Sequence, residues 1–525
     1  MNVHLMYRDR DFDLDHELPG NAQALTEDLD LQTLLGAMGL GDPYLFKVAQ
    51  VALLSSVTDP DTITYRQGVL RDCLAHQTVV RAIYEMAVDT LDAEKKVHFG
   101  LFALSSQYPD ATLHGAVEAL RVFAERLKLL RDLADEHAHE FESEGFTAFF
   151  AMLARELDDE YLQTVQEHLT ELGGHGGVRA SAQLGQGANG VKYRLHRRRG
   201  RGLVARITSL ASRSEYVYRI ADRDEQGART LGELRGRAIN EVANTAAQSG
   251  EHIRGFFNLL RAELGFYIGA LNLHTQLTAK GEPTCLPTPV AAGRYTLTAR
   301  GMYEPCLTLR TESRVVGNDI NGEDKPLVVI TGANQGGKST FLRSAGIAQL
   351  MMQCGMFVAA QALSANVCEG VFTHFKREED TTMTSGKLDE ELARMSEITD
   401  ALSANCVVLF NESFAATNER EGSQIAREII TALIDTGTKV LFVTHMYDLA
   451  HGLHSDQRER GLFLRAERQA DGRRTFRLAE AEPLPTSYGP DVFARVFATD
   501  RDRSPGAGKD GAARPGAESL QPVRP

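Results

Sequence analysis

One eight-residue motif constrains the fold of this chain more than any other feature of its sequence. Residues 332–339 read Gly-Ala-Asn-Gln-Gly-Gly-Lys-Ser, which fits the phosphate-binding pattern G-x-x-x-x-G-K-[ST]. The β-branched run Val328–Ile330 precedes the motif, and a helical pattern begins at Lys338. A strand, a glycine-rich turn and a helix together let backbone N–H groups surround phosphate oxygens. The motif therefore predicts a nucleotide site on an α/β fold.

The motif also predicts the role of each of its residues. Lys338 is expected to reach the β- and γ-phosphates, and the Ser339 hydroxyl is expected to bind the Mg²⁺ that accompanies ATP. ATP and Mg²⁺ are therefore the predicted ligands. The expected nucleotide-binding residues are Gly332, Ala333, Asn334, Gln335, Gly336, Gly337, Lys338, Ser339 and Thr340.

A second apolar run, Val407–Phe410, ends in Asn411 and Glu412. Glu412 is placed to orient or deprotonate an attacking water molecule. Position 411 is normally an Asp that holds Mg²⁺ through water, and an Asn supplies a hydrogen-bond acceptor without negative charge. We therefore expect an ATPase with slow turnover. A nucleotide-binding switch that does not turn over is the alternative.

A third apolar run, Lys439–Val443, is followed by Thr444 and His445. A His at the end of a strand beside the γ-phosphate can sense that group or steer the water. Lys338, Glu412 and His445 are therefore the predicted catalytic residues, and Ser339 and Asn411 the predicted Mg²⁺ ligands, Asn411 through water. Strand and helix patterns alternate after the proline-rich stretch Pro283–Pro289, which predicts a parallel sheet with crossover helices.

Helical periodicity dominates the chain before this stretch, over residues 31–172 and 231–277. Between these regions, His175–Ser214 holds nine Lys and Arg residues and no Asp or Glu, with strand-like alternation in Val178–Leu184 and Val191–Leu195. We expect a DNA-contacting β-rich tip on a helical stalk, and a solvated basic loop is the alternative. The expected DNA contacts are Lys192, Arg194, Arg197, Arg198, Arg199 and Arg201.

Composition limits the class of protein. The chain of 525 residues has a net charge of −14, which excludes a histone-like protein when the chain is taken as a whole. Its six cysteines form no C-x-x-C pair, which is typical of a reducing compartment. The start of the chain has no signal-peptide pattern, and the apolar stretch Ala348–Leu363 is too short to span a membrane. We expect a soluble cytoplasmic protein without membrane association, and an association with the nucleoid stays open.

Six motifs, in order over about 200 residues, resemble those of the MutS family of DNA mismatch-repair ATPases, and a seventh, weaker match lies far upstream. The P-loop resembles the family's TGPNxGGKST, and residues 411–422 have the length of its DE-x-G-x-GT-x₄-G segment. Val316–Ile320 resembles PNDI, Val371–His374 resembles IFTR, and Thr444–Leu449 resembles TH-x-x-(E/D)L. Pro485–Gly489 resembles SYG, and the upstream match, Ile63–Gln67, resembles I-x-x-R-Q.

The resemblance implies a homodimer with two nucleotides between facing ABC-type ATPase domains and two helical arms closing around DNA. It implies an ATP-gated clamp on duplex, mismatched or branched DNA, acting in mismatch repair or recombination control. The family's signature loop SGxSTFMxEM contacts the partner's γ-phosphate. Its counterpart here starts at Ser385, Gly386 and Lys387, followed by acids at 389–391 that we expect to face away from the phosphate or to take up Mg²⁺.

The predicted fold class is multidomain α plus α/β, with a helical lever, a small β-rich clamp insertion and an ABC-type P-loop ATPase domain. We expect an acidic, solvated or partly ordered segment over 1–40, the lever over 41–282 with the insertion at about 175–230, the ATPase domain over 283–498 and a disordered tail over 499–525. The family's N-terminal mismatch-reading module, with its F-x-E wedge, has no predicted counterpart here, so DNA shape and phosphate charge are expected to dominate binding. A transporter nucleotide-binding subunit is a third reading, disfavoured because long helical arms have no place there.

Overall fold

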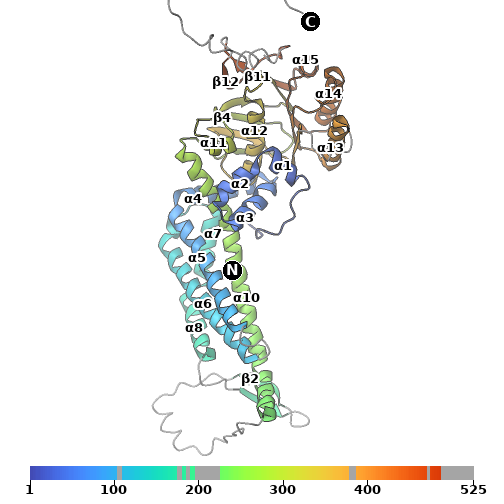
Figure 1. The fold of residues 1–525 in the computed structure, drawn as a ribbon. Helices are drawn as coiled ribbons and strands as arrows, with labels where there is room; N and C mark the ends of the chain where they lie inside the picture. Colours follow the sequence, from blue (N-terminus) through green and yellow to red (C-terminus); the bar gives the residue numbers. More distant parts are fainter. Residues whose placement is uncertain are drawn as a thin grey trace, which may run out of the picture.

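The computed structural model describes residues 1–102, 109–173, 180–184, 190–195, 225–377, 386–469 and 473–485. These residues form a long helical stalk and an α/β domain, and one helix, α10 (Glu225–Ala279), runs from the far end of the stalk to the α/β domain (Figure 1). The expected combination of helical and α/β parts is therefore present.

The helices before the α/β domain begin where the sequence supplies caps. Asp42 and Asp59 each accept a hydrogen bond from a backbone N–H of the helix that follows, and Pro43 and Pro60 occupy the first helical positions. The helices are α1 (Ala22–Asp28), α2 (Leu31–Gly39), α3 (Pro43–Leu54), α4 (Pro60–Ala75), α5 (Gln77–Phe102), α6 (Pro109–His137), the 3₁₀ turn η1 (Ala138–Glu140), α7 (Glu144–Glu156) and α8 (Asp159–Gly173).

The stalk is built around α10, which packs against α5 and α6. Its 55 residues correspond to about 80 Å of helix. The strands β1 (Ala180–Leu184) and β2 (Gly190–Leu195) pair antiparallel, and β2 lies beside α10 at the far end of the stalk (Figure 1). The helical pattern predicted up to residue 172 is present, with a break between α7 and α8.

The N-terminal residues correct one prediction. Val3, Leu5, Met6 and Phe12 are buried in the main core, so the segment is not the solvated or partly ordered chain expected from its acids. Glu263 of α10 holds this segment, because its carboxylate accepts hydrogen bonds from the backbone N–H groups of residues 5, 6 and 12 at 2.6, 3.1 and 3.0 Å. The acidic side chains point outward between these buried positions, which hid the apolar pattern.

The α/β domain contains the predicted parallel sheet. Its strand order is β12-β11-β6-β10-β9-β8, and all neighbouring pairs are parallel except the β11–β12 hairpin. The strands are β6 (Leu327–Gly332), β8 (Val371–Phe375), β9 (Val407–Asn411), β10 (Lys439–Val443), β11 (Gly461–Arg468) and β12 (Arg474–Glu480). The connecting helices are α12 (Lys338–Gln353), α13 (Lys387–Ala401), α14 (Glu419–Asp435) and α15 (Tyr447–Asp456). Helix α14 begins after Asn418, whose side chain accepts a hydrogen bond from the backbone N–H of Glu421.

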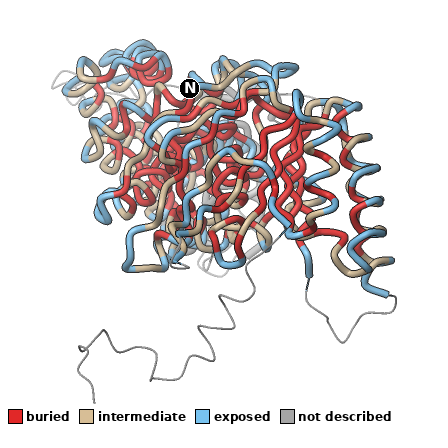
Figure 2. Tube along the Cα trace, turned by 90° about the horizontal axis from the view of Figure 1, so that it is seen from above, coloured by how far each residue is buried: buried red, intermediate tan, exposed pale blue. Residues whose placement is uncertain are grey.

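The central strands of this sheet are buried on both faces. Val328 and Ile330 of β6 belong to the core shared with α12 and the N-terminal helices, whereas Leu327 and Val329 belong to a second core with α14 and α15. Figure 2 shows the same arrangement, with buried strands inside and exposed residues on the outer sides of the helices. A strand buried on both faces reads as a continuous apolar run, which is why these strands were visible in the sequence.

A second, four-stranded sheet lies beside the large one and was not predicted in detail. Its order is β3-β7-β4-β5, formed by Thr288–Val290, Ala362–Asn366, Leu297–Met302 and Asn318–Asn321, with α11 (Pro305–Arg310) between β4 and β5. Lys439 of β10 links the two sheets, because its ammonium group donates to the Thr296 carbonyl at 2.8 Å and to the Asn366 side chain. Burial lowers the pKa of Lys439 to about 8. No helix among the described residues has both the length and the apolar composition of a membrane span.

The Glu263 anchor generates a stability prediction. In Glu263→Gln, an amide NH₂ faces a backbone N–H that had an oxygen acceptor, so we expect the free energy of unfolding to fall by ~1–3 kcal/mol at pH 5. Burial raises the pKa of Glu263 to about 7, so the stability it contributes is present at low pH and is lost as the pH rises through about 7. The difference in the free energy of unfolding between wild type and variant, measured by urea unfolding, should therefore become smaller toward pH 8.

Glu251→Gln is the matched control, because Glu251 is an exposed residue of the same helix. Equal stability of Glu263→Gln and wild type at pH 5 would contradict the anchoring role.

Candidate nucleotide-binding site

The P-loop joins β6 to α12 through several left-handed backbone conformations. Gly332 and Gly337 have φ values of 107° and 90°, and Gln335 between them has a φ of 59°. At Gly336 a Cβ would lie 2.8 Å both from the Ala333 carbonyl oxygen and from the Ala466 Cβ, so the loop has no room for a side chain there. The glycines of the motif are therefore required by the shape of the loop itself.

Lys338, the first residue of α12, lies beneath this loop. Its ammonium group donates to the carbonyl oxygens of Gly332 and Ala333 at 3.0 and 3.2 Å. Burial lowers the pKa of Lys338, the nearby charge of Glu412 raises it, and the positive charge of Arg474 lowers it further. Arg474, in β12, donates to the Asn334 carbonyl at 3.3 Å and so brings a second cation over the loop.

Ser339 and Asn411 meet at the end of β6 and β9. The Ser339 hydroxyl donates to the Asn411 side-chain oxygen at 2.8 Å. Hydroxyl and amide oxygens are suitable ligands for Mg²⁺, and phosphate oxygens usually complete its shell. No group of three or more His, Cys, Asp or Glu side chains suited to a metal occurs in the described part of the chain. The pair therefore fits an ion held mainly by nucleotide phosphates.

Glu412 and His445 follow the neighbouring strands β9 and β10. The Glu412 backbone N–H donates to the Val443 carbonyl at 2.9 Å, which fixes the start of the turn after β9. The Glu412 carboxylate lies 3.8 Å from Nδ1 of His445. Both side chains line a cavity of about 360 Å³ together with residues 334–340. The structure thus brings together all the residues predicted as catalytic or as Mg²⁺ ligands.

An apolar cavity of about 290 Å³ adjoins the P-loop and was missed by sequence reasoning. Val315 and Val316 line it on one side and Phe476 of β12 lines it on another, and it shares Gln335, Gly337 and Thr340 with the phosphate cavity. The side-chain amide of Asn318 donates to the Phe476 carbonyl at 3.1 Å. Phe476 is 48% exposed, and an exposed aromatic residue beside a P-loop indicates this cavity in the structure. No local sequence motif indicates the cavity.

The candidate signature residues are only partly described. Ser385 lies outside the described residues, Gly386 precedes α13, and Lys387 is the first residue of that helix. Glu391 is buried, and one of its carboxylate oxygens has no hydrogen-bond partner among the described residues, so it does not extend toward solvent. Its burial raises its pKa. The trans contact itself stays a prediction.

The predicted DNA contacts also stay predictions. Lys192 and Arg194 lie on β2, the second strand of the hairpin at the end of the stalk. Arg197, Arg198, Arg199 and Arg201 fall outside the described residues.

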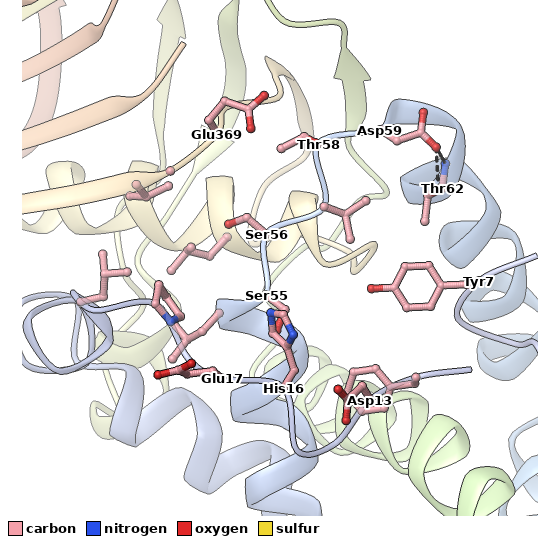
Figure 3. A pocket seen from close by; sticks show the side chains of 18 of the residues that line it. Tyr7, Asp13, His16, Glu17, Ser55, Ser56, Thr58, Asp59, Thr62 and Glu369 are labelled. Carbon is pink, nitrogen blue, oxygen red and sulfur yellow. Dashed lines mark hydrogen bonds between the residues drawn. The ribbon is translucent and has the colours of Figure 1, made fainter. Parts of the chain in front are cut away.

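A larger cavity lies elsewhere, where the N-terminal segment, the α3–α4 connection and the start of β8 meet (Figure 3). It has a volume of about 670 Å³ and its labelled side chains include Asp13, Glu17, Asp59 and Glu369 with His16. Carboxylates repel the phosphate groups of a nucleotide. None of the described residues predicted to bind nucleotide lines this cavity, so the candidate site remains at the P-loop.

The fold and this site define a P-loop protein with a long helical arm. Residues 58–280 match the MutS2 N-terminal domain, and residues 328–499 match MutS domain V. The chain belongs to the MutS family.

Three relatives illustrate the similarity. A DNA mismatch repair protein MutS of Natronomonas pharaonis is 32% identical over 190 residues, which are 36% of this chain and 22% of the relative. The MutS of Thermus aquaticus is 31% identical over 199 residues, 38% of this chain and 24% of the relative. A DNA mismatch repair protein MutS 2 of Halobacterium salinarum is 31% identical over 185 residues, 35% and 21% of the two chains. Each similarity thus spans less than a quarter of the relative.

The tight contacts of Gly336 predict the effect of a single methyl group. Gly336→Ala should displace the P-loop from Ala333 and Ala466 and weaken Mg–ATP binding at least tenfold, by more than ~1.4 kcal/mol. The increase in melting temperature on adding Mg–ATP measures this, because a ligand stabilises the state that binds it. Gly250→Ala is the control, since no atom of the described residues, apart from the neighbouring backbone of its own helix, lies within 4 Å of its Cβ position. If Mg–ATP raises the melting temperature of Gly336→Ala as much as that of wild type, the loop tolerates the added methyl group.

Proposed function

We propose that this protein is a DNA-binding ATPase of the MutS type, a dimeric ATP-gated clamp that acts on duplex, mismatched or branched DNA in mismatch repair or recombination control. The observation that carries the proposal is the convergence of the P-loop, Asn411, Glu412 and His445 at one edge of the sheet. The relatives named DNA mismatch repair proteins support the DNA part of the proposal.

Each group at this edge has a chemical task in the proposed reaction. The loop N–H groups and Lys338 hold the phosphates, and Ser339, with Asn411 through water, holds Mg²⁺, which would neutralise phosphate charge. The apolar cavity beside Phe476 accommodates the adenine base. Glu412 takes a proton from the attacking water, and His445 lies 3.8 Å from its carboxylate, where it can respond to the γ-phosphate.

The neutral side chain at 411 makes the proposed turnover slow. Asn411 keeps the hydrogen bond from Ser339 but adds no negative charge to balance the cation. The second candidate function, a nucleotide-binding switch on DNA with little or no turnover, rests on the same residue.

The proposed clamp assigns a task to each part of the chain. Residues 41–282 form the lever, the basic β-rich insertion at about 175–230 is the DNA-contacting tip, residues 283–498 form the ABC-type ATPase domain, and 1–40 and 499–525 flank them. Ser385, Gly386 and Lys387 contact the nucleotide of an identical partner. The continuous helix α10 links the tip and the ATPase domain in this arrangement. We place the protein in the cytoplasm with DNA.

Hydrolysis in a single turnover separates the two functions. Glu412→Gln removes the proposed base but keeps a similar shape, so we expect turnover to fall by about a hundredfold or more with ATP affinity preserved. Asn411→Asp restores a charge beside Ser339, so we expect hydrolysis to rise and to need less Mg²⁺. Quantifying labelled phosphate release under enzyme excess measures both. Undetectable wild-type cleavage that Asn411→Asp rescues identifies the switch, and turnover unchanged in Glu412→Gln refutes the catalytic assignment.

Salt dependence tests the clamp. Phosphate contacts release counterions, so DNA affinity should fall steeply between 50 and 200 mM salt, by about 10³-fold or more for six contacts. Changing the arginines at 197–199 to Gln should weaken binding and reduce the slope. A triple Gln variant at the exposed arginines Arg155, Arg294 and Arg427 is the control of equal charge. Fluorescence anisotropy with homoduplex, mismatched and branched DNA gives both quantities, and salt-independent binding would exclude the proposed tip.

A further inference from the structure

His374, in β8, joins three elements at the back of the candidate site. Its Nδ1 lies 2.8 Å from the Ser413 hydroxyl, in the turn after β9, and its Nε2 lies 2.9 Å from the backbone carbonyl oxygen of Glu391, in α13. The Ser413 hydroxyl is also 2.5 Å from the carbonyl oxygen of His374. Both His374 and Ser413 are fully buried, so no water competes for these bonds.

The carbonyl at Glu391 fixes the protonation of the ring. A carbonyl oxygen only accepts, so Nε2 carries the proton and Nδ1 of the neutral ring is an acceptor. The single proton of the Ser413 hydroxyl is shared between Nδ1 and the His374 carbonyl oxygen, which also accepts. Burial lowers the pKa of His374 to about 4, which keeps the ring neutral at physiological pH. His374 thus ties Ser413 to α13 through one defined tautomer.

The turn that His374 holds is strained. Glu412 and Phe414 have φ values of 56° and 62°, a left-handed conformation that costs a non-glycine residue about 1–2 kcal/mol. The MutS motif has Gly at the position of Phe414, where such a φ is free of this cost. Strain of this kind persists only where the surroundings fix the backbone. Ser413 lies between the two strained residues, and the fully buried ring of Phe414 stacks on His374 at 5.2 Å and 14°.

We propose that His374 is a positioning residue that aims Glu412 at the nucleotide cavity and couples this aim to the position of α13. The inference rests on the proposed ATPase function, which places the start of α13 against the partner's nucleotide. A displacement of α13 moves the Glu391 carbonyl, and the Nε2–carbonyl and Nδ1–Ser413 bonds transmit it to the residue next to Glu412. Engagement of a nucleotide by the partner thereby orients the base of this protomer.

The test removes the hydrogen bonds while keeping an aromatic ring. In His374→Phe the stack on Phe414 persists but both ring hydrogen bonds are lost, so we expect kcat for ATP to fall about ten- to a hundredfold while Kd for Mg–ATP stays within about twofold. Ser413→Ala should lower kcat similarly, and the double variant should add little, because both changes break one chain of bonds. His374→Gln, which keeps a donor for the Glu391 carbonyl, should recover part of the loss.

Gln353→Leu is the matched control. Gln353 is buried in α12 and hydrogen-bonds to the Val57 and Cys368 carbonyls, far along the chain from Glu412. Gln353→Leu should lower the free energy of unfolding, as His374→Phe does, and should leave kcat unchanged. Wild-type kcat in a folded His374→Phe, or an equal loss of kcat in Gln353→Leu, overturns the proposal.

Hydrogen exchange gives a readout that does not need turnover. In wild type, a non-hydrolysable ATP analogue with Mg²⁺ should slow amide exchange both at the start of α13 and in residues 412–416. In His374→Phe only α13 should respond, and equal protection of 412–416 in both proteins overturns the coupling. If Glu412→Gln leaves wild-type turnover intact, the proposed ATPase mechanism fails, and the exchange result still decides the role of His374.

Discussion

Parallel pairing of β6, β10 and β9 fixes where the charged groups of the candidate site lie. Val443 of β10 is in register with Ile330 on one side and with Asn411 on the other, so the three strands end at the same edge. Each strand is buried on both faces, and a shift of one residue would move apolar side chains out of both cores. Glu412 directly follows β9, His445 lies two residues after β10, and Lys338 begins the helix that follows β6 and the P-loop. The packing of the two cores on these strands therefore sets the distances between the side chains of the site.

The helical part depends on a similar long-range constraint. Glu263 anchors residues 5, 6 and 12 from inside α10, and Arg66 of α4 donates to the Met6 and Cys354 carbonyls at 2.9 and 3.2 Å. The same N-terminal residues therefore join the base of the stalk to α12, the helix that follows the P-loop. Movement of the stalk relative to the phosphate site would have to break the buried hydrogen bonds of the Arg66 guanidinium. Hydrogen bonds of a charged group are stronger than neutral ones. Buried hydrogen bonds thus connect the base of the stalk to the α/β domain.

Some of this could be predicted from the sequence and some could not. The P-loop and the three strands were predictable because a doubly buried strand is a run of apolar residues and the loop glycines are contiguous. The N-terminal segment was not, because Phe12 stands between two acids and the N–H groups of Leu5 and Phe12 bind Glu263 some 250 residues away. The cavity beside Phe476 and the contact of His374 with Ser413 also join distant segments. Such contacts have no local period, so only the folded chain reveals them.

The charge around the phosphate cavity makes the turn after β9 more important than the motif alone indicates. Of the residues lining that cavity, Glu412 is the one carboxylate among those described, because position 411 is an amide. In the proposed ATPase this single group has to activate water and also supply the negative charge nearest to Mg²⁺. A change in the orientation of the Glu412 carboxylate would affect both tasks, and no second carboxylate among the described lining residues would compensate. A strained turn clamped by a buried His, Ser and Phe is a physical means of keeping one carboxylate in one direction.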